Sequence, residues 1–401
     1  MPEKLKITKR FVDTVSSPET GQKIYQDSEL RGFAIRVTPT MKTFIINRKF
    51  NGKTVRHKIA SYPEITAEMA RDEAQKILGD LSRGILPKDK MIKQEAEATT
   101  LEKAFNDYIQ DKKFKLKPKT LKDYHDVMRL QLVSFSKKKL IDIKRNDVLD
   151  LHKNLSQRSL ARANLAMRLL KAIYNYSMEK YRLSDDTPMI IENPVRAMDG
   201  TKAWNRIKRR TRMVSVQELP DWYRALTTLE GRKNNNYDVT RDFLFFALFT
   251  GLRRTEILTL KWEQINLRRK VVTITDTKNH LEHVLPLSNY LMDLLKRRQS
   301  NNPTNFRYVF PDKTKTTHLK EPKSFINKVK NLSEIEFSTH DLRRTFITIA
   351  ESLDIPHYAL KRLLNHKKGN DVTSGYIIDD VERLRKPINL IHTRILELFD
   401  I

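Results

Sequence analysis

Apolar residues recur at two different spacings along this chain, and the spacing changes at positions that divide it into three segments. Strand-like alternation of β-branched and aromatic residues fills the first segment, up to about residue 86. Helical spacing then takes over, and alternation returns only between residues 271 and 287. Because 401 residues are too many for one compact core, we predict a multidomain protein that is mainly α with small β regions.

The charge balance of the chain limits the partners that it can have. Lys and Arg number 77 against 49 Asp and Glu, so the formal net charge is +28 at pH 7. The positive charge is spread over the whole length and is not gathered in one amphipathic segment, which favours a nucleic acid over a membrane surface as the partner. The net charge alone does not exclude the alternative that the protein is basic but binds no polyanion.

Two absences exclude several kinds of site and location. Without cysteine the chain has no disulfide, thiolate metal site or cysteine nucleophile, and it can work in a reducing cytosol. Residues 1–10 contain no apolar targeting segment, and the longest strongly apolar run, residues 243–249, is far too short to cross a bilayer. We therefore expect a cytoplasmic protein that is not bound to a membrane.

Residues 1–86 are predicted to form a three- or four-stranded antiparallel sheet followed by a helix. Asn51-Gly52 has the composition of a hairpin turn, and the helical pattern of residues 66–82 starts after Pro63 and ends before Gly84. The expected strands are residues 23–26, 33–38, 43–50 and 53–60.

One face of this sheet is expected to be basic. On the last strand the basic residues alternate with the apolar Val55 and Ile59, so they point away from the core. Such a face either contacts DNA or is simply solvated, and the pattern does not decide between the two. The candidate DNA contacts are Arg36, Lys49, Arg56 and Lys58.

Residues 98–195 are predicted to form a helical bundle between two linkers. Residues 87–99 contain no aromatic residue, and residues 200–213 contain six Lys or Arg with almost no apolar periodicity. We expect the second linker to lie against phosphates. Arg162 and Arg168, on the last helix of the bundle, are further candidate DNA contacts. The expected helices are residues 101–111, 120–135, 146–155 and 159–181.

Residues 212–401 are predicted to form an α-rich domain with one β-hairpin. Two alternating strands within residues 271–287 flank a turn at residues 276–279. The tail, residues 381–401, is apolar enough to dock on another surface. Packing on its own domain and docking on a neighbouring subunit both fit the sequence.

Six polar residues of this domain have the types that a reaction at a phosphodiester requires. Negative charge builds up on the phosphate oxygens in the transition state, and arginine is the best donor because its planar fork holds two oxygens and keeps its charge. His340 and Arg343, three residues apart on a predicted helix, can reach one ligand. The candidate catalytic residues are Arg253, Lys278, His340, Arg343, His366 and Tyr376.

The helical wheel favours Arg343 over its neighbour Arg344 as a catalytic residue. Leu342, Phe346 and Ile349 form the apolar stripe of the predicted helix. Arg343 borders this stripe, whereas Arg344 points away from it.

A tyrosine nucleophile would let DNA strands be rejoined without ATP, because its ester with phosphate conserves the energy of the broken bond. Tyr376 is the candidate nucleophile. Tyr358 is the competing tyrosine, but it lies before His366 among helical residues, where we expect it to pack. Lys278, on the predicted turn, is the candidate acid for the leaving hydroxyl.

The candidates, in this order, resemble the catalytic set of tyrosine recombinases, the family of phage and genomic-island integrases. Residues 250–256 satisfy the family pattern Thr-Gly-x-Arg-x-x-Glu, and this pattern alone selects Arg253 over Arg254. We expect Glu256 to support an arginine or a helix amino terminus. Residues 363–377 are similar to the Leu-Gly-His to Tyr segment of that family, with Asn365 where glycine is usual. The first segment resembles an arm-type DNA-binding domain, and the second is similar in position to a core-binding domain.

The resemblance implies a site-specific DNA recombinase, an integrase of a temperate phage, a genomic island or a conjugative element. Tyr376 would form a 3′-phosphotyrosyl bond with DNA while Arg253 and Arg343 hold the phosphate. His340 and His366 would handle the tyrosine proton and a phosphate oxygen, and these two roles could be exchanged. The resemblance implies no metal and no other cofactor.

The partners implied by the resemblance are double-stranded DNA at attachment sites and three further copies of the chain in a homotetramer. DNA-bending or excision proteins are possible accessories, and the expected location is the bacterial cytosol at the nucleoid. Two rival functions remain. A type IB topoisomerase shares the chemistry but acts alone, and a DNA-binding regulator would not need the catalytic set.

His280 and His283 have a spacing that is seen in metal sites. No cysteine or acidic cluster accompanies them. We therefore expect both on the surface of a strand, without a metal.

Overall fold

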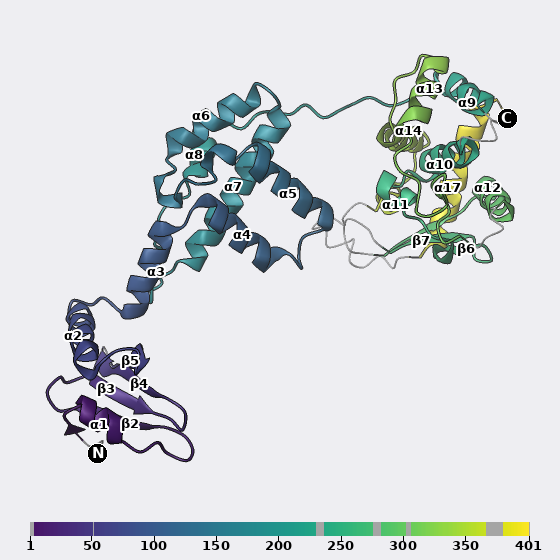
Figure 1. The fold of residues 1–401 in the computed structure, drawn as a ribbon. Coiled ribbons are helices and arrows are strands. Elements are labelled where there is room, and N and C mark those ends of the chain that lie inside the picture. Colours follow the sequence, from purple (N-terminus) through teal and green to yellow (C-terminus); the bar gives the residue numbers. More distant parts are fainter. Residues whose placement is uncertain are drawn as a thin grey trace. The chain divides into compact units, whose positions relative to one another are not determined.

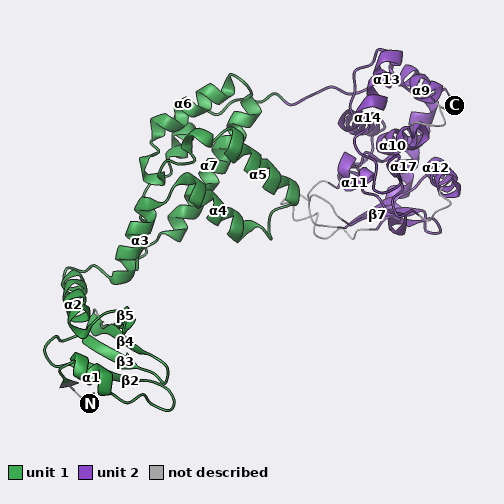
Figure 2. Ribbon diagram, in the orientation of Figure 1, with its two compact units in different colours: residues 1–208 green, residues 209–401 purple. Residues whose placement is uncertain are grey.

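The computed structural model describes residues 4–50, 52–229, 236–275, 282–301, 306–365 and 380–400. The chain divides into two compact units, Met1–Lys208 and Arg209–Ile401 (Figure 2). The boundary falls in the basic segment 200–213 that was predicted to be a linker, and residues 203–215 have no regular structure. The division into three domains, 1–86, 98–195 and 212–401, stays a prediction. Among the described helices none is long and apolar enough to cross a membrane.

The first unit begins with a sheet whose strands follow one another in the order β1-β2-β3-β4-β5 (Figure 1). Strands β2 to β5 pair antiparallel, as predicted, and β1 adds a short parallel edge next to β2. β1 was not predicted because two residues are too few to show alternation. The strands are β1 (Lys4–Leu5), β2 (Lys23–Asp27), β3 (Phe33–Val37), β4 (Lys42–Phe50) and β5 (Lys53–Tyr62).

One face of this sheet forms a core with helices α1 (Lys9–Thr14) and α2 (Ala67–Ser82). Thr66 caps α2 by accepting a hydrogen bond from the backbone N–H of Met69. The core consists of Phe33, Ile35, Val37, Phe44 and Ile46 from the strands and Ala70, Ala74 and Leu78 from α2. The predicted helix 66–82 is therefore confirmed.

The opposite face of the sheet carries the four predicted basic residues. The register pairs Arg36 with Thr43 and Ile45 with Lys58, while Arg56 lies across from Asn47. The side chains of Lys49, Arg56 and Lys58 are exposed, whereas Arg36 is half-buried. The Arg36 Nε atom is buried, and in the described part of the chain it has no hydrogen-bond partner. Whether this face contacts DNA stays a prediction.

The rest of the first unit is helical. The predicted linker 87–99 is wrong, because residues 87–98 form a helix that starts with proline at its first position and Asp89 in its first turn. Ala96 is buried against the bundle. The long helix at the centre of the bundle exposes Arg162 and Arg168. The helices are α3 (Pro87–Ala98), α4 (Leu101–Lys112), α5 (Pro118–Leu130), α6 (Arg145–Ser156), α7 (Leu160–Lys180) and α8 (Ala197–Gly200), with 3-10 turns at Val133–Phe135, Leu140–Asp142 and Pro194–Arg196.

The second unit is built around α10 (Tyr237–Thr250), in which residues 240–250 are all buried. Helix α14 (Thr339–Ser352) packs against it, and α11, α12 and α17 also contact it (Figure 1). The other helices are α9 (Leu219–Thr228), α11 (Arg254–Leu258), α12 (Asn289–Ser300), α13 (Lys323–Ser333), α15 (His357–Leu363) and α17 (Arg385–Glu397), with 3-10 turns at Trp262–Gln264 and Glu382–Leu384.

The β region of this unit has three strands instead of the predicted two. β7 (Val271–Ile274) pairs antiparallel with β8 (His283–Pro286), as predicted, and the two-residue strand β6 (Ile265–Asn266) pairs with β7. The predicted turn at residues 276–279 lies outside the described residues.

The carboxyl-terminal tail packs on its own unit. Ile388, Ile391 and Ile395 of α17 belong to the same buried core as α10 and α14. The tail also brings in a buried histidine, His392, whose Nε2 donates to the carbonyl oxygen of Phe249. Its Nδ1 lies 2.6 Å from the Ser288 hydroxyl, which must be the donor because Nε2 carries the proton.

Acid should weaken the second unit through His392. Burial lowers the pKa of His392 from 6.5 to about 4. Between these pH values the unfolded chain binds a proton that the folded chain does not, so stability falls as the pH drops from about 6.5 toward 4, by up to roughly 3 kcal/mol. Urea unfolding measured near neutral pH and near pH 5 should detect this loss.

Two variants test the assignment. His392→Gln cannot titrate and should show a flatter pH dependence, whereas His357→Gln replaces an exposed histidine and should keep the wild-type slope. Equal slopes in wild type and His392→Gln would contradict the prediction.

Candidate active site

Arg253 lies where α10 ends and α11 begins. Its Nη1 is 3.0 Å from Glu256 Oε1, and its backbone N–H donates to Glu256 Oε2 at 2.9 Å. Glu256 is buried, while a quarter of the Arg253 side chain is exposed. The predicted role of Glu256 is therefore confirmed, because it holds both the arginine and the amino terminus of α11.

Arg343 is buried on α14 with only 6% of its surface exposed. Its Nη1 donates to the carbonyl oxygen of Gly251 at 2.5 Å, and its Nη2 donates to the carbonyl oxygen of Leu364 at 2.8 Å. Arg344, by contrast, is bound to Asp341 on the same helix. The helical wheel thus predicted correctly which of the two arginines turns inward.

The two candidate arginines lie close enough to influence each other. Burial and, to a smaller extent, the positive charge of Arg253 lower the pKa of Arg343 to about 10, while Glu256 opposes the shift. Arg343 still carries its charge at neutral pH. Two like charges held beside a single carboxylate favour an anion between them.

His340 lies one turn before Arg343 on α14 and is exposed. Partial burial, together with the positive charges of Arg344 and Arg343, lowers its pKa. The imidazole is therefore neutral at neutral pH, which is the form that can accept a proton.

The three remaining candidates, Lys278, His366 and Tyr376, lie outside the described residues. One residue near them is described: Leu364, two positions before His366, accepts a hydrogen bond from Arg343. Asn365, where the family pattern has glycine, adopts a φ of 49°. This left-handed conformation suits glycine best and asparagine better than most other residues, which explains the substitution.

His283 was predicted to lie on a strand surface, and this is wrong. Only 6% of the residue is exposed, its Nε2 donates to the carbonyl oxygen of Arg362 at 2.9 Å, and burial lowers its pKa to about 4. Its Nδ1 is buried, and no described residue forms a hydrogen bond with it. The signal was present in β8, where alternation places His283 on the same side as the buried Leu285. His280 lies outside the described residues.

Tyr358 was predicted to pack, and this is also wrong. The residue is 42% exposed on α15, where the Lys361 ammonium lies 5.9 Å from the centre of its ring. Tyr358 is therefore accessible at the surface, and the two tyrosines must be compared by mutation.

Comparison with known proteins agrees with these features. Residues 215–383 match the phage integrase family, and residues 7–94 match the Arm DNA-binding domain. The chain is 25% identical to prophage integrase IntF of Escherichia coli (strain K12), over 92% of this chain and 86% of that protein. It is 22% identical to the integrase of Shigella phage Sf6, over 84% of this chain and 85% of that protein.

Solved structures share the fold. The lambda integrase in a tetramer bound to a Holliday junction aligns with a TM-score of 0.55 and 17% identity, over 92% of this chain and all of that chain. The Tn1549 transposon integrase in complex with transposon right end DNA aligns with a TM-score of 0.53 and 15% identity, over 73% of this chain and 99% of that chain. The chain belongs to the phage integrase family of tyrosine recombinases, and it is a site-specific recombinase of the integrase type.

Gly251→Ala should displace the carbonyl that orients Arg343. A Cβ atom at residue 251 would lie 2.7 Å from Phe346 Cδ1, and the residue has a φ of 60°. We expect a loss of about 1–3 kcal/mol in the stability of the second unit, measured by urea unfolding, together with slower DNA cleavage.

Gly84→Ala is the matched control for backbone strain. Gly84 has a φ of 85°, but a Cβ atom there would meet nothing within 4 Å. This variant should lose only about 1 kcal/mol from the first unit and cleave DNA normally. Equal effects of the two substitutions on cleavage would mean that contact with Phe346 is unimportant.

Proposed function

We propose that this integrase cuts and rejoins DNA through Tyr376 while Arg253 and Arg343 hold the phosphate. The observation that supports this most strongly is the pair of arginines beside Glu256, one of them held in place by the carbonyl oxygens of Gly251 and Leu364. A guanidinium held in advance loses little entropy when it binds the phosphate, and it stabilises the charge that develops on the oxygens.

The proposed reaction exchanges one phosphate ester for another. The Tyr376 oxygen attacks phosphorus, the bond from phosphorus to the 5′ oxygen breaks, and a 3′-phosphotyrosyl bond remains. Lys278 gives a proton to the leaving 5′ hydroxyl. A hydroxyl of the partner strand then reverses these steps. The lowered pKa of His340 supports a role in accepting the tyrosine proton, and His366 would then bind a phosphate oxygen, although the two roles can be exchanged.

The proposal extends to the DNA and to the assembly. The net charge of +28 and the exposed Arg162 and Arg168 suit double-stranded DNA at attachment sites. Exchange of four strands needs four active sites, and the lambda integrase is seen as a tetramer on a Holliday junction. We therefore propose a homotetramer that integrates and excises a mobile element, helped by DNA-bending or excision proteins, in the bacterial cytosol. The chemistry requires no metal.

A nicked DNA substrate that loses the leaving strand should trap the wild-type protein covalently. Tyr376→Phe lacks the attacking oxygen, so no covalent complex should form, and electrophoresis under denaturing conditions would measure this. Tyr358→Phe is the matched control and should be trapped like wild type. Trapping of Tyr376→Phe but not of Tyr358→Phe would contradict the assignment of the nucleophile.

Lys278→Met should cleave normal DNA slowly but recover on DNA that has sulfur in place of the leaving 5′ oxygen. A thiol has a pKa of about 8.5 and leaves without needing a proton, so loss of the acid should no longer matter. Single-turnover cleavage rates on the two substrates give the comparison.

Arg343→Gln is the control for this experiment. It should be slow on both substrates, because sulfur at the leaving position does not replace a phosphate-binding charge. No recovery of Lys278→Met on the sulfur substrate would exclude Lys278 as the acid.

A further inference from the structure

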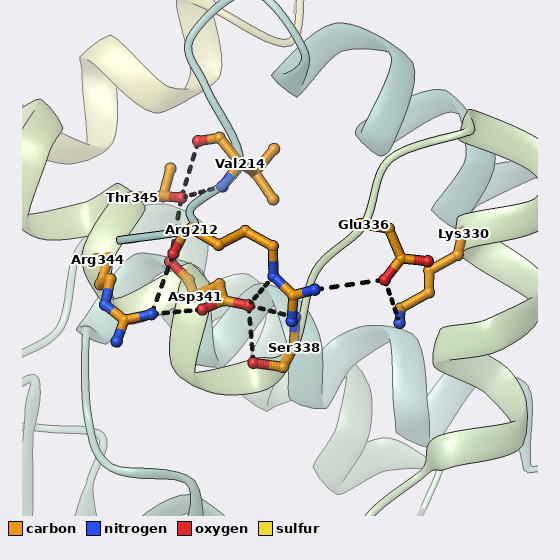
Figure 3. Close-up of polar contacts among 8 residues, drawn as sticks. All are labelled: Arg212, Val214, Lys330, Glu336, Ser338, Asp341, Arg344 and Thr345. Atoms are coloured by element: carbon orange, nitrogen blue, oxygen red, sulfur yellow. Dashed lines mark hydrogen bonds and ion pairs between the residues drawn. The ribbon is translucent and has the colours of Figure 1, made fainter. Parts of the chain in front are cut away.

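The last residues of the linker lie along α14, the helix that carries His340 and Arg343 (Figure 3). The backbone N–H of Val214 donates to the Thr345 hydroxyl at 3.0 Å, and that hydroxyl is 2.9 Å from the Val214 carbonyl oxygen. One residue earlier, Met213 Sδ is 3.3 Å from the Thr348 hydroxyl. The segment is thus bound to α14 at successive turns of the helix.

The strongest contacts of this segment meet at Asp341. The carboxylate is 2% exposed and accepts a hydrogen bond from Arg212 Nε at 2.9 Å. Arg344 Nη1 donates to the other carboxylate oxygen at 2.6 Å and also reaches the carbonyl oxygen of Arg212 at 3.1 Å. Ser338 contributes its backbone N–H and its hydroxyl, both at 2.9 Å. We call Arg212, Asp341 and Arg344 the linker clasp.

The linker clasp lies in the part of α14 on which the chemistry depends. Asp341 follows His340 directly and precedes Arg343 by two residues, and it caps the first turn of the helix. A carboxylate at this end of a helix is favourable, but a buried carboxylate that loses one of its cations must turn or draw in water. Any such movement of Asp341 would move the first turn and the side chains on either side of it.

Two carboxylates lie beside Arg212, so its guanidinium is less suited to binding a phosphate. Its guanidinium faces Asp341 and also lies 3.4 Å from Glu336, so its positive charge is already compensated. Glu336 is in turn bound by Lys330 at 2.8 Å. Arg209, three residues earlier in the linker, is exposed and makes no ion pair with any residue that the structure describes. The linker therefore contains two kinds of arginine.

We propose that Arg212 is a positioning residue for DNA cleavage, which acts through Asp341 to hold the first turn of α14 and with it His340 and Arg343. The inference rests on the proposed function and adds to it a residue that does not touch DNA.

The test compares Arg212→Ala with Arg209→Ala, since each variant removes one positive charge from the same linker. Cleavage is measured in a single turnover on the nicked trapping substrate at saturating DNA, and DNA affinity is measured separately. Arg212→Ala should cleave about 10- to 100-fold more slowly while its DNA affinity stays within about threefold of wild type. Arg209→Ala should cleave at the wild-type rate at saturating DNA.

Two further variants separate positioning from a loss of folding. Arg212→Lys keeps a cation that can reach Asp341 and should restore most of the rate. Asp341→Asn also weakens the contact with Arg344, so it should be at least as slow as Arg212→Ala. The double variant should be no slower than Asp341→Asn, because Arg212 acts through Asp341. Thermal unfolding of each variant, expected to stay cooperative, shows whether the second unit remains folded.

Clear results would overturn the inference. If Arg212→Ala cleaved like Arg209→Ala at saturating DNA, or if Arg212→Lys were as slow as Arg212→Ala, then Arg212 would not position α14. Multiplied losses in the double variant would also exclude it. Failure of the wild-type protein to form any covalent complex would instead refute the proposed function, so the two failures are distinguishable.

Discussion

The bonds from Arg343 to the carbonyl oxygens of Gly251 and Leu364 hold together the parts of the chain that make this site. The two carbonyls lie 92 and 21 residues from the arginine in sequence. One ends α10, just before Arg253, and the other ends α15, just before the segment that carries His366 and Tyr376. The guanidinium therefore connects α14 with the ends of α10 and α15, and it is also the proposed ligand of the phosphate. This explains why it is buried in a chain whose other basic residues are mostly at the surface.

The contact between Arg343 and Gly251 requires a residue without a side chain at position 251. Gly251 has a left-handed backbone conformation, and the ring of Phe346, three residues after Arg343, leaves no room for a Cβ atom there. The pairing of α10 with α14 thus places the carbonyl oxygen within reach of the arginine. Near the same end of α10, His392 of the tail binds the carbonyl oxygen of Phe249, so a second long-range contact also holds this end of the helix. Arg343 is therefore held in place by the protein itself, as the proposed stabilisation of a transition state requires.

Two different groups of residues act on α14. Arg253 and Glu256 set the electrostatic surroundings of Arg343, whereas Arg212 and Arg344 bind Asp341 at the start of the helix. The first pair forms part of the proposed phosphate site, and the second binds the carboxylate in the first turn of the helix. In a protein with a net charge of +28, carboxylates such as Glu256 and Asp341 are placed where they order arginines.

Local pattern determined much of this protein. Alternation predicted β2 to β5, helical spacing predicted α2, α4, α6 and α7, and the wheel of α14 distinguished Arg343 from Arg344, because these features depend on a residue and its near neighbours. Helix α3 was missed because its few apolar residues are stabilised by packing against the bundle, which the sequence of residues 87–99 does not reveal. The two-residue strands β1 and β6 were missed because they exist only through their partners. The six candidate catalytic residues were named from residue type together with the resemblance to the tyrosine recombinase family. Only the tertiary structure decided that the tail packs on its own unit and that Arg212 meets Asp341, because each of these depends on contacts between residues far apart in the chain.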